Sequence, residues 1–112
     1  MVCVQKVGIF VCLMNKFTDN TTIGVVMTNA YFEKPSLCKI AGMAHNGFAR
    51  SINPVHTTAD GDSIYAVSLG DVAADQDIVG TLAAEVMSEA IKSAVNSAES
   101  AYGFPSASSL DF

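Results

Sequence analysis

The sequence is poor in charge, and above all in positive charge. Only 15% of its 112 residues are charged, and 6 basic side chains stand against 11 acidic ones, so that the net charge is -5. Binding to a phosphate backbone requires clustered lysine and arginine side chains. The composition therefore argues against a nucleic-acid-binding surface.

Cysteine is also scarce. Cys3, Cys12 and Cys38 are odd in number, lie in apolar surroundings and form no Cys-x-x-Cys pair. This pattern disfavours both a disulfide framework and a zinc site, and it predicts reduced, buried thiols. We predict no metal and no cofactor.

Long apolar runs are missing. Residues 7–14 form an apolar segment after a single lysine, Lys6, but the segment is too short to span a bilayer. It also lacks the small-residue cleavage pattern of a signal peptide. The sequence therefore predicts a soluble, cytoplasmic protein without a membrane partner.

Apolar side chains are nevertheless abundant, at half of all residues. A chain of this length is sufficient for one domain with a modest core and too short for two of ordinary size. Part of the apolar surface then lacks cover within a single copy. We therefore expect the chain to self-associate, as a homo-oligomer.

Three segments have the character of β-strands. Residues 2–14 and 22–28 are apolar and β-branched without a helical period, and the second segment predicts a central strand covered on both faces. Gly24 within it would let a neighbouring group come close. Residues 63–70 predict a further strand.

Two segments have the period of amphipathic helices. The first covers 35–52, with a proline in its first turn, and the second begins at Asp75 or Asp77 and ends near residue 100. The element order is strand, strand, helix, strand, helix, which predicts an α/β (α+β layered) fold, a small β-β-α-β-α domain. Three short strands beside two helices with apolar faces suggest half of a larger layered structure.

A pair of threonines, Thr21 and Thr22, begins the second predicted strand directly after Asn20. A threonine at a strand start is most simply a β-former whose hydroxyl bonds locally. Alternatively, the Thr21 hydroxyl attacks the preceding carbonyl, the acyl group moves from nitrogen to oxygen, and hydrolysis of the ester frees the α-amine of Thr21. That amine, with a pKa of about 7.7 to 8.0, is a base near neutral pH.

Asp60 and Asp62 flank Gly61 in a segment that is typical of a solvated turn. In an extended segment, residues two apart point to the same face, so that both carboxylates would serve one site and orient a threonine hydroxyl and amine. His45 and His56 have no metal-ligand or catalytic partner at a motif spacing. We interpret both as hydrogen-bonded structural histidines.

Three blocks resemble, in order and spacing, the C-terminal part of the P1 family peptidases. They are NTTIGVVMTNA, MAHNGFARSINPVHTTADGDSIYAVSLG and VGTLAAEVMSEAIKSAV, and together they cover about residues 20–98. This family comprises the DmpA-like aminopeptidases, and its relatives include β-peptidyl aminopeptidases and the endo-type 6-aminohexanoate oligomer hydrolase. The ornithine acetyltransferases share the autocleaving layered fold, but the second block argues against them.

The resemblance implies an N-terminal-nucleophile hydrolase whose precursor cuts itself into a large α and a small β subunit. Its fold is half of a DmpA-like layered sandwich, and its substrates are peptides or other amides with a free or unusual amino end. By position, Asn20 precedes the cut, Thr21 is the nucleophile, and Asp60 and Asp62 hydrogen-bond around it. Residues 1–20 are then a strand and loop upstream of the cut, 21–100 the β-subunit-like domain, and 101–112 a loosely ordered tail.

The family's remaining site residues lie in its large N-terminal part, whereas 20 residues precede Thr21 here. The oxyanion donors expected of an amide hydrolase therefore have no evident source in this chain. Two explanations stay open. Either the chain is the β portion of a two-part enzyme with a separate large α-subunit-like partner, or it is a truncated, noncatalytic interaction or assembly domain with the same fold.

Overall fold

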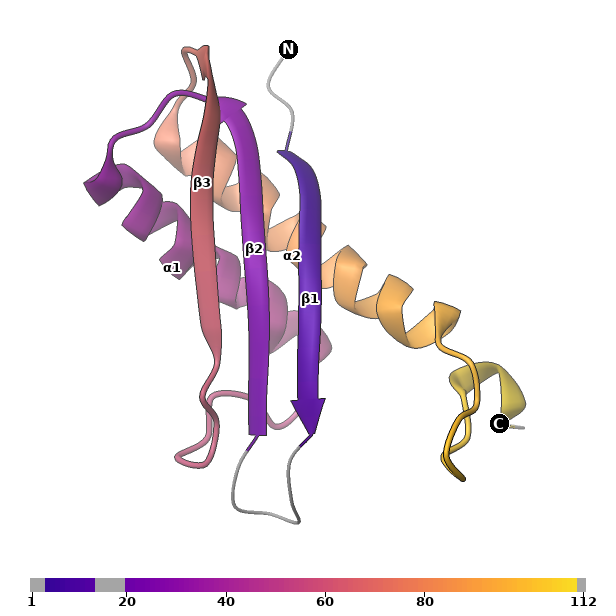
Figure 1. Cartoon of the computed structure of the whole chain (residues 1–112). Helices are drawn as coiled ribbons and strands as arrows, with labels where there is room; N and C mark the ends of the chain where they lie inside the picture. The colour runs from indigo at the N-terminus through magenta and orange to yellow at the C-terminus, as the bar shows by residue number, and fades with distance from the viewer. Residues whose placement is uncertain (1–3, 14–19, 111–112) are drawn as a thin grey trace.

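The computed structural model describes residues 4–13 and 20–110, and describes side chains from Thr21 onward. Its elements follow the predicted order (Figure 1): β1 (Val4–Leu13), β2 (Asn20–Ala30), α1 (Lys34–Ser51), β3 (Ser63–Val72), α2 (Gln76–Ser97) and a 3-10 turn, η1 (Ala107–Ser109). The predicted α+β layered class is confirmed.

The sheet contains both kinds of strand pairing. Its order is β1-β2-β3, with β1 antiparallel to β2 and β2 parallel to β3. In the parallel pair, Ile23 lies opposite Ser63 and Met27 opposite Val67. Because parallel strands begin at the same edge of a sheet, the loop that leads into Ser63 arrives beside the first residues of β2.

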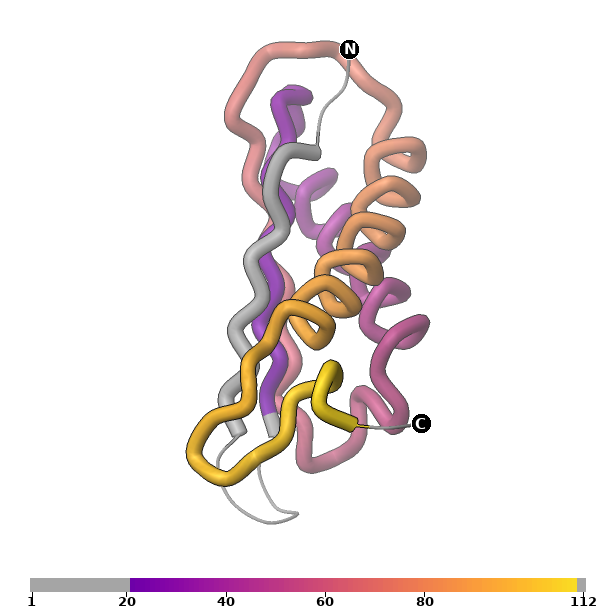
Figure 2. The backbone as a smooth tube through the Cα atoms, turned by 90° about the vertical axis from the view of Figure 1, so that its right-hand side faces the viewer, coloured from indigo at the N-terminus to yellow at the C-terminus, as the bar shows by residue number. Residues whose placement is uncertain are grey.

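The two helices lie together on one face of the sheet (Figure 2). From Gly24 to Ala30 of β2 every second residue is buried, as expected of a strand with one face on the core. Helices α1 and α2 contribute most of the remaining apolar side chains. The core consists of Val26, Ala30, Ile40, Ala44, Phe48, Val79, Ala83, Met87 and Ile91.

Glycines allow the layers to approach closely. A Cβ at Gly24 of β2 would lie 2.7 Å from the Met87 methyl carbon of α2, so the predicted close approach at Gly24 is confirmed. A Cβ at Gly47 of α1 would lie 2.5 Å from the backbone oxygen of Ala84. A side chain at Gly47 would collide with backbone, so this site requires glycine, whereas at Gly24 the flexible end of the Met87 side chain would have to move.

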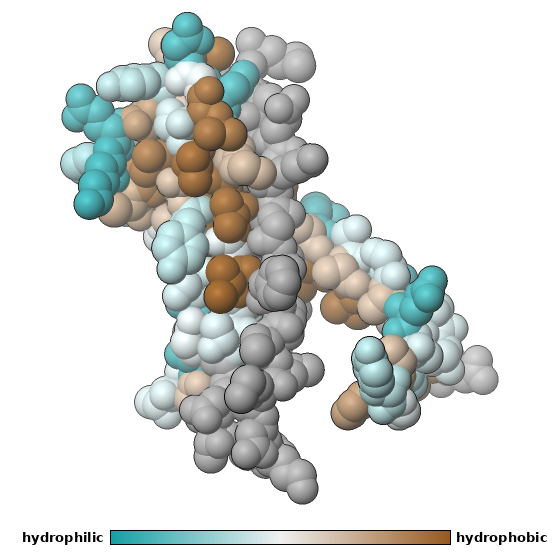
Figure 3. All heavy atoms as spheres, viewed as in Figure 1, coloured by the Kyte–Doolittle hydropathy of each residue, from teal (hydrophilic) through white to brown (hydrophobic). Residues whose placement is uncertain are grey.

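The other face of the sheet carries exposed apolar side chains. Ile23 on β2 is 37% exposed, and Tyr65 and Leu69 on β3 are 61% and 67% exposed. Figure 3 shows apolar atoms along this face over the described part of the strands. The expectation that β2 is central is correct, but within the described residues its cover comes from the helical side alone.

The helix ends follow local chemistry. The side chain of Asp75 accepts hydrogen bonds from the backbone N–H groups of Asp77 and Ile78, so Asp75 is the N-cap of α2. Helix α1 has its proline in the first turn and ends at Ser51. The predicted bounds of both helices are therefore close to the observed ones.

Cys38 lies exposed on α1 as a free thiol, so the prediction of a buried cysteine is wrong at this position. The apolar face of the helix is set by Ile40, Ala44 and Phe48, and Cys38 falls outside it. Cys3 and the side chain of Cys12 lie outside the described residues.

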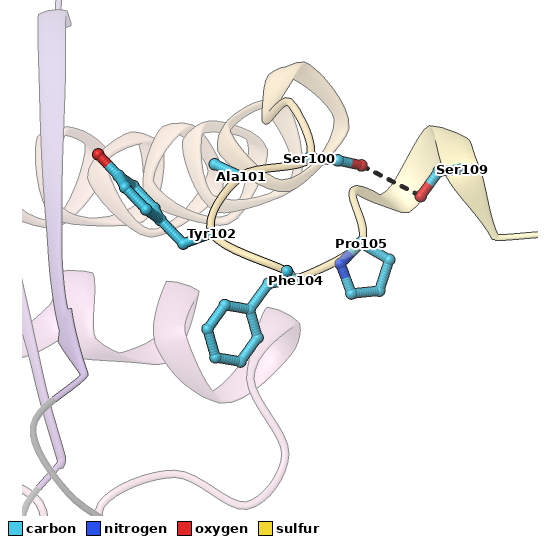
Figure 4. Close-up of a pocket in the computed structure, with 7 residues that line it drawn as sticks. Ser100, Ala101, Tyr102, Phe104, Pro105 and Ser109 are labelled. Carbon is cyan, nitrogen blue, oxygen red and sulfur yellow. Dashed lines mark hydrogen bonds between the residues drawn. The ribbon is translucent and has the colours of Figure 1, made fainter.

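Beyond α2, where the sequence predicts a loosely ordered tail, the chain makes a turn and then η1. Ala101 pairs with Phe104 across the turn, and serine hydroxyls tie the two parts together, with Ser100 bonded to Ser106 and Ser109. Figure 4 shows the hollow that this turn forms, with Tyr102, Phe104 and Pro105 among the residues that line it. Residues 100–109 alone line it, and none is a candidate site residue.

Candidate active site at the start of the parallel strand pair

Thr21 and Thr22 are the second and third residues of β2, and residues 61 and 62 precede β3 directly. The parallel register, extended backward by two residues from the Ile23–Ser63 pair, places Thr21 beside Gly61 and Thr22 beside Asp62. The backbone N–H of Thr22 donates to Oδ1 of Asp62 at 3.0 Å. One sheet edge thus joins two sequence blocks that are 40 residues apart.

The Thr21 hydroxyl lies directly against Gly61. A Cβ built at Gly61 would be 2.7 Å from Thr21 Oγ1, which is closer than any side chain permits. Gly61 therefore has a steric reason to be glycine, in addition to its place in a turn-like sequence. Thr21 itself is half-buried.

Asp62 is the buried carboxylate of this region. Its side chain is 6% exposed, and its Oδ2 lies 2.7 Å from Nδ1 of His56. The two atoms are at ion-pair distance, although among the described residues Oδ2 has no hydrogen bond of regular geometry.

Asp60 is oriented differently. Its Oδ2 accepts from the backbone N–H of Thr57 at 2.6 Å, and its own N–H donates to the Thr57 carbonyl. These bonds close a turn within the loop. The two aspartates of the predicted pair therefore have different partners here: Asp62 bonds the start of β2, and Asp60 bonds its own loop.

Two histidines that sequence reasoning placed outside the site belong to its surroundings. The His56 ring lies edge-on to His45, with 4.9 Å between centroids, and stacks on Phe48 at 6.0 Å. Burial lowers the pKa of His45, nearby His56 lowers it further, and Asp62 acts in the opposite direction. The six-residue separation of His56 and Asp62 matches no standard catalytic spacing, so only the folded loop reveals the contact.

Asn20 and Thr21 are the first two residues of β2. On the partner strand β1, Leu13 lies opposite Asn20 and Cys12 opposite Thr21. The predicted cleavage point therefore lies at the start of β2, between two residues that both pair with β1. The side chain of Asn20 lies outside the described residues.

A family model describes almost the whole of this chain: Peptidase family S58 matches residues 3–108. The chain belongs to peptidase family S58. This is the DmpA family, so the resemblance seen in the three sequence blocks is confirmed.

Among curated proteins, the S58 chain is similar to aminopeptidases named as uncharacterized. It is 37% identical to one from Mycobacterium leprae and 34% identical to one from Mycobacterium tuberculosis, over 77% of this chain in both cases. It is also 32% identical, over 64% of this chain, to the 6-aminohexanoate-oligomer endohydrolase of Paenarthrobacter ureafaciens. The matched parts are 28%, 29% and 24% of those proteins, so the chain spans less than a third of their length.

Two further observations concern what the S58 chain could bind. Within residues 4–13 and 20–110, no three histidine, cysteine or carboxylate side chains are grouped as a metal site would require. No helix in that part of the chain is long and apolar enough to cross a membrane. The expectations of no metal, no cofactor and a cytoplasmic location stay predictions.

Proposed function

We propose that this S58 chain is the nucleophile-bearing β portion of an amide hydrolase, with Thr21 as the nucleophile after cleavage of the Asn20–Thr21 bond. The observation that carries the proposal is the contact of the Thr21 hydroxyl with Gly61, next to the buried carboxylate of Asp62. The names of the relatives, aminopeptidase and 6-aminohexanoate-oligomer endohydrolase, support amide hydrolysis as the reaction class.

The processing step needs one hydroxyl and one water molecule. Thr21 Oγ1 attacks the carbonyl carbon of Asn20, the C–N bond breaks, and the nitrogen takes a proton as the α-amine of Thr21. Water then hydrolyses the ester between Asn20 and Oγ1. The products are a carboxylate at Asn20 and a free amino terminus at Thr21.

The same hydroxyl then serves the substrate reaction. The α-amine of Thr21 accepts the hydroxyl proton while Oγ1 attacks the amide carbonyl of a peptide or amino-acid oligomer. The C–N bond of the resulting tetrahedral intermediate breaks, the amine product leaves with that proton, and an ester to Oγ1 remains. Water then hydrolyses the ester to a carboxylate and restores the hydroxyl. Asp62 fixes the strand beside the nucleophile through the Thr22 N–H. Asp60 provides a second carboxylate in the adjacent turn, and we propose that it turns toward the new amino terminus once the strand is cut.

A large α-like portion completes the proposed site. The chain spans less than a third of its curated relatives, and the oxyanion donors would come from the part that it does not cover. The exposed apolar face of β2 and β3, which includes Ile23, Tyr65 and Leu69, offers a surface for this portion and for self-association. We propose both partners, and neither a nucleic acid nor a membrane.

One observation favours the second candidate, a noncatalytic assembly domain. The Asn20–Thr21 bond lies within a strand that pairs with β1 on both sides of it. In that case β1 stays covalently joined to β2 and completes the sheet. The polar groups around Thr21 would then stabilise a strand end rather than a nucleophile.

The intact mass of the purified chain separates the two candidates. We expect a fragment that begins at Thr21 and ends at Phe112, with Thr21→Ala remaining whole and Thr21→Ser, which retains a hydroxyl, still cut. Each variant is incubated alone and with the large portion of a matched S58 relative. If Thr21→Ser and the parent chain stay whole under both conditions, the assembly domain is the better reading.

A further inference from the structure

The carboxyl group of Asp62 lies in a place that water hardly reaches. With its side chain 6% exposed, its Oδ1 accepts the Thr22 N–H, and its Oδ2 is buried beside Nδ1 of His56 at 2.7 Å. A buried carboxylate oxygen is costly unless a donor faces it. Among the described residues Oδ2 has no hydrogen bond of regular geometry, and Nδ1 of His56 is the group within reach of it at 2.7 Å.

The backbone of His56 is held in an uncommon conformation. Its φ angle is 56°, in the left-handed region that residues other than glycine rarely adopt, although asparagine, aspartate and histidine occur there more often than most. Such a conformation persists where the surrounding structure holds it, and it is concentrated at functional sites. At residue 56 it accompanies the approach of the ring to Asp62.

The ring of His56 is fixed from the helical layer. Its plane is 26° from that of Phe48, which is fully buried in the core, and His45 contacts it from the same helix, α1. A continuous set of contacts therefore runs from the core of α1 through His56 to Asp62 and to the backbone of Thr22.

We propose that His56 is a positioning residue for the nucleophile. Its Nδ1–H holds the Asp62 carboxylate, Asp62 holds the Thr22 N–H, and the start of β2 is thereby fixed with the Thr21 hydroxyl against Gly61. This role in the reaction rests on the proposed function of Thr21. The physical link between His56 and Thr22 exists independently of it and is tested independently.

Two substitutions of His56 test its hydrogen-bond donor and its aromatic ring separately. His56→Asn retains a donor at about the place of Nδ1 and tolerates a positive φ, but it loses the stacking on Phe48. His56→Phe retains the ring and loses the donor. Both are made in the full-length chain with Thr21→Ala, so that all samples have the same covalent state.

The measurement is amide hydrogen exchange at Thr22, taken relative to amides in the core of α2. A positioning role predicts that His56→Phe accelerates Thr22 exchange at least about tenfold, because its acceptor loses its own partner, whereas His56→Asn stays within about threefold of the parent. A role in packing alone predicts faster Thr22 exchange in His56→Asn than in His56→Phe, and that result would overturn the proposal.

If His56→Phe does not fold, His56→Asn decides alone: exchange within about threefold supports the proposal, and tenfold acceleration refutes it. The pKa of His45 provides a second readout for this variant. Because His56 contributes to the lowering of that pKa, it should rise when the imidazole is removed.

The link to catalysis is read in chains that retain Thr21. There, His56→Phe should slow the appearance of the fragment that begins at Thr21, and His56→Asn should restore its rate. If no chain is cut, either alone or with the large portion of a matched S58 relative, while the exchange result holds, the proposed function fails and the positioning contact stands. If cutting is unaffected by His56→Phe although Thr22 exchange accelerates, the catalytic part of this inference is wrong.

Discussion

The helical layer and the strand edge at Thr21 differ in the kind of side chain that they bury: the first buries apolar groups and the second polar ones. Between α1 and α2, the contacts are apolar and so close that Gly47 meets the backbone of Ala84. At the edge, by contrast, a half-buried hydroxyl, a buried carboxylate and an imidazole lie together. The first region supplies the stability of the fold, and the second contains groups whose burial costs free energy.

The difference shows how a small domain can hold a reactive group. Phe48 belongs to both regions, since it is buried in the core and also stacks on His56. The polar cluster is therefore not a separate loop feature, because His56 rests on the buried face of α1. Substitutions in the helical layer should mainly lower the free energy of unfolding, whereas substitutions in the polar cluster should mainly change the cleavage rate or the pKa of His45.

The largest effect is expected at Phe48. Phe48→Ala removes a fully buried aromatic ring and should lower the free energy of unfolding by about 3 to 5 kcal/mol. It should also loosen His56, because the stacking surface is lost. Denaturant unfolding measures the first effect, and hydrogen exchange at Thr22 the second. A variant with normal stability would contradict the assignment of Phe48 to the core.

A smaller loss is expected at the helix crossing. Gly47→Ala places a methyl group against the Ala84 carbonyl and should cost about 1 to 3 kcal/mol. Gly42 on the same helix is the matched control, because a Cβ there meets nothing within 4 Å. Gly42→Ala should stabilise the chain by about 0.5 to 1 kcal/mol. Equal effects in the two variants would show that the helices are not in close contact.

The helical layer could be predicted from the sequence because its signals are local. Apolar side chains recur at helical spacing, and an aspartate stands where α2 needs an N-cap, so both helices were predicted close to their observed bounds. The outward position of Cys38 was missed. An apolar neighbourhood in sequence does not say which side of a helix a residue faces.

The strand edge was predictable only in part. Extended-segment geometry and the family resemblance associated Thr21 with Asp60 and Asp62, and the structure brings Asp62 to the start of β2. It gives Asp60 a local partner, Thr57, and it gives Asp62 a histidine. These pairings depend on the path of the loop 52–62, where short-range turn bonds compete with contacts across the sheet edge, and sequence spacing does not resolve that competition.

Substitution of Gly61 should affect the cleavage rate much more than the free energy of unfolding. A methyl group at this position would displace the Thr21 hydroxyl, since a Cβ would lie 2.7 Å from its Oγ1. The loop is at the surface, so we expect Gly61→Ala to change the free energy of unfolding by less than about 1 kcal/mol. The rate of cleavage at Asn20–Thr21 should fall at least about tenfold, because small misplacements of reacting atoms are costly. Mass spectrometry follows the rate, and cleavage at the parent rate would contradict this placement of the nucleophile.

The smallest effect is expected from His45, through the pH dependence of stability. Its pKa in the folded chain is lowered from 6.5, first by burial and then by His56. Between 6.5 and that lower value, the unfolded chain therefore binds more protons than the folded one, and stability falls as the pH decreases through this window. His45→Gln should remove this component, so that the difference in unfolding free energy between the parent and the variant changes with pH only below about 6.5.

Asp62→Asn tests the opposing contribution to the same pKa. Because Asp62 raises the pKa of His45, its replacement by a neutral amide should lower that pKa further, and an NMR titration of the His45 ring measures the change. A rise would mean that the carboxylate does not face the two imidazoles, and the contact between the helical layer and the strand edge would then have to be placed elsewhere.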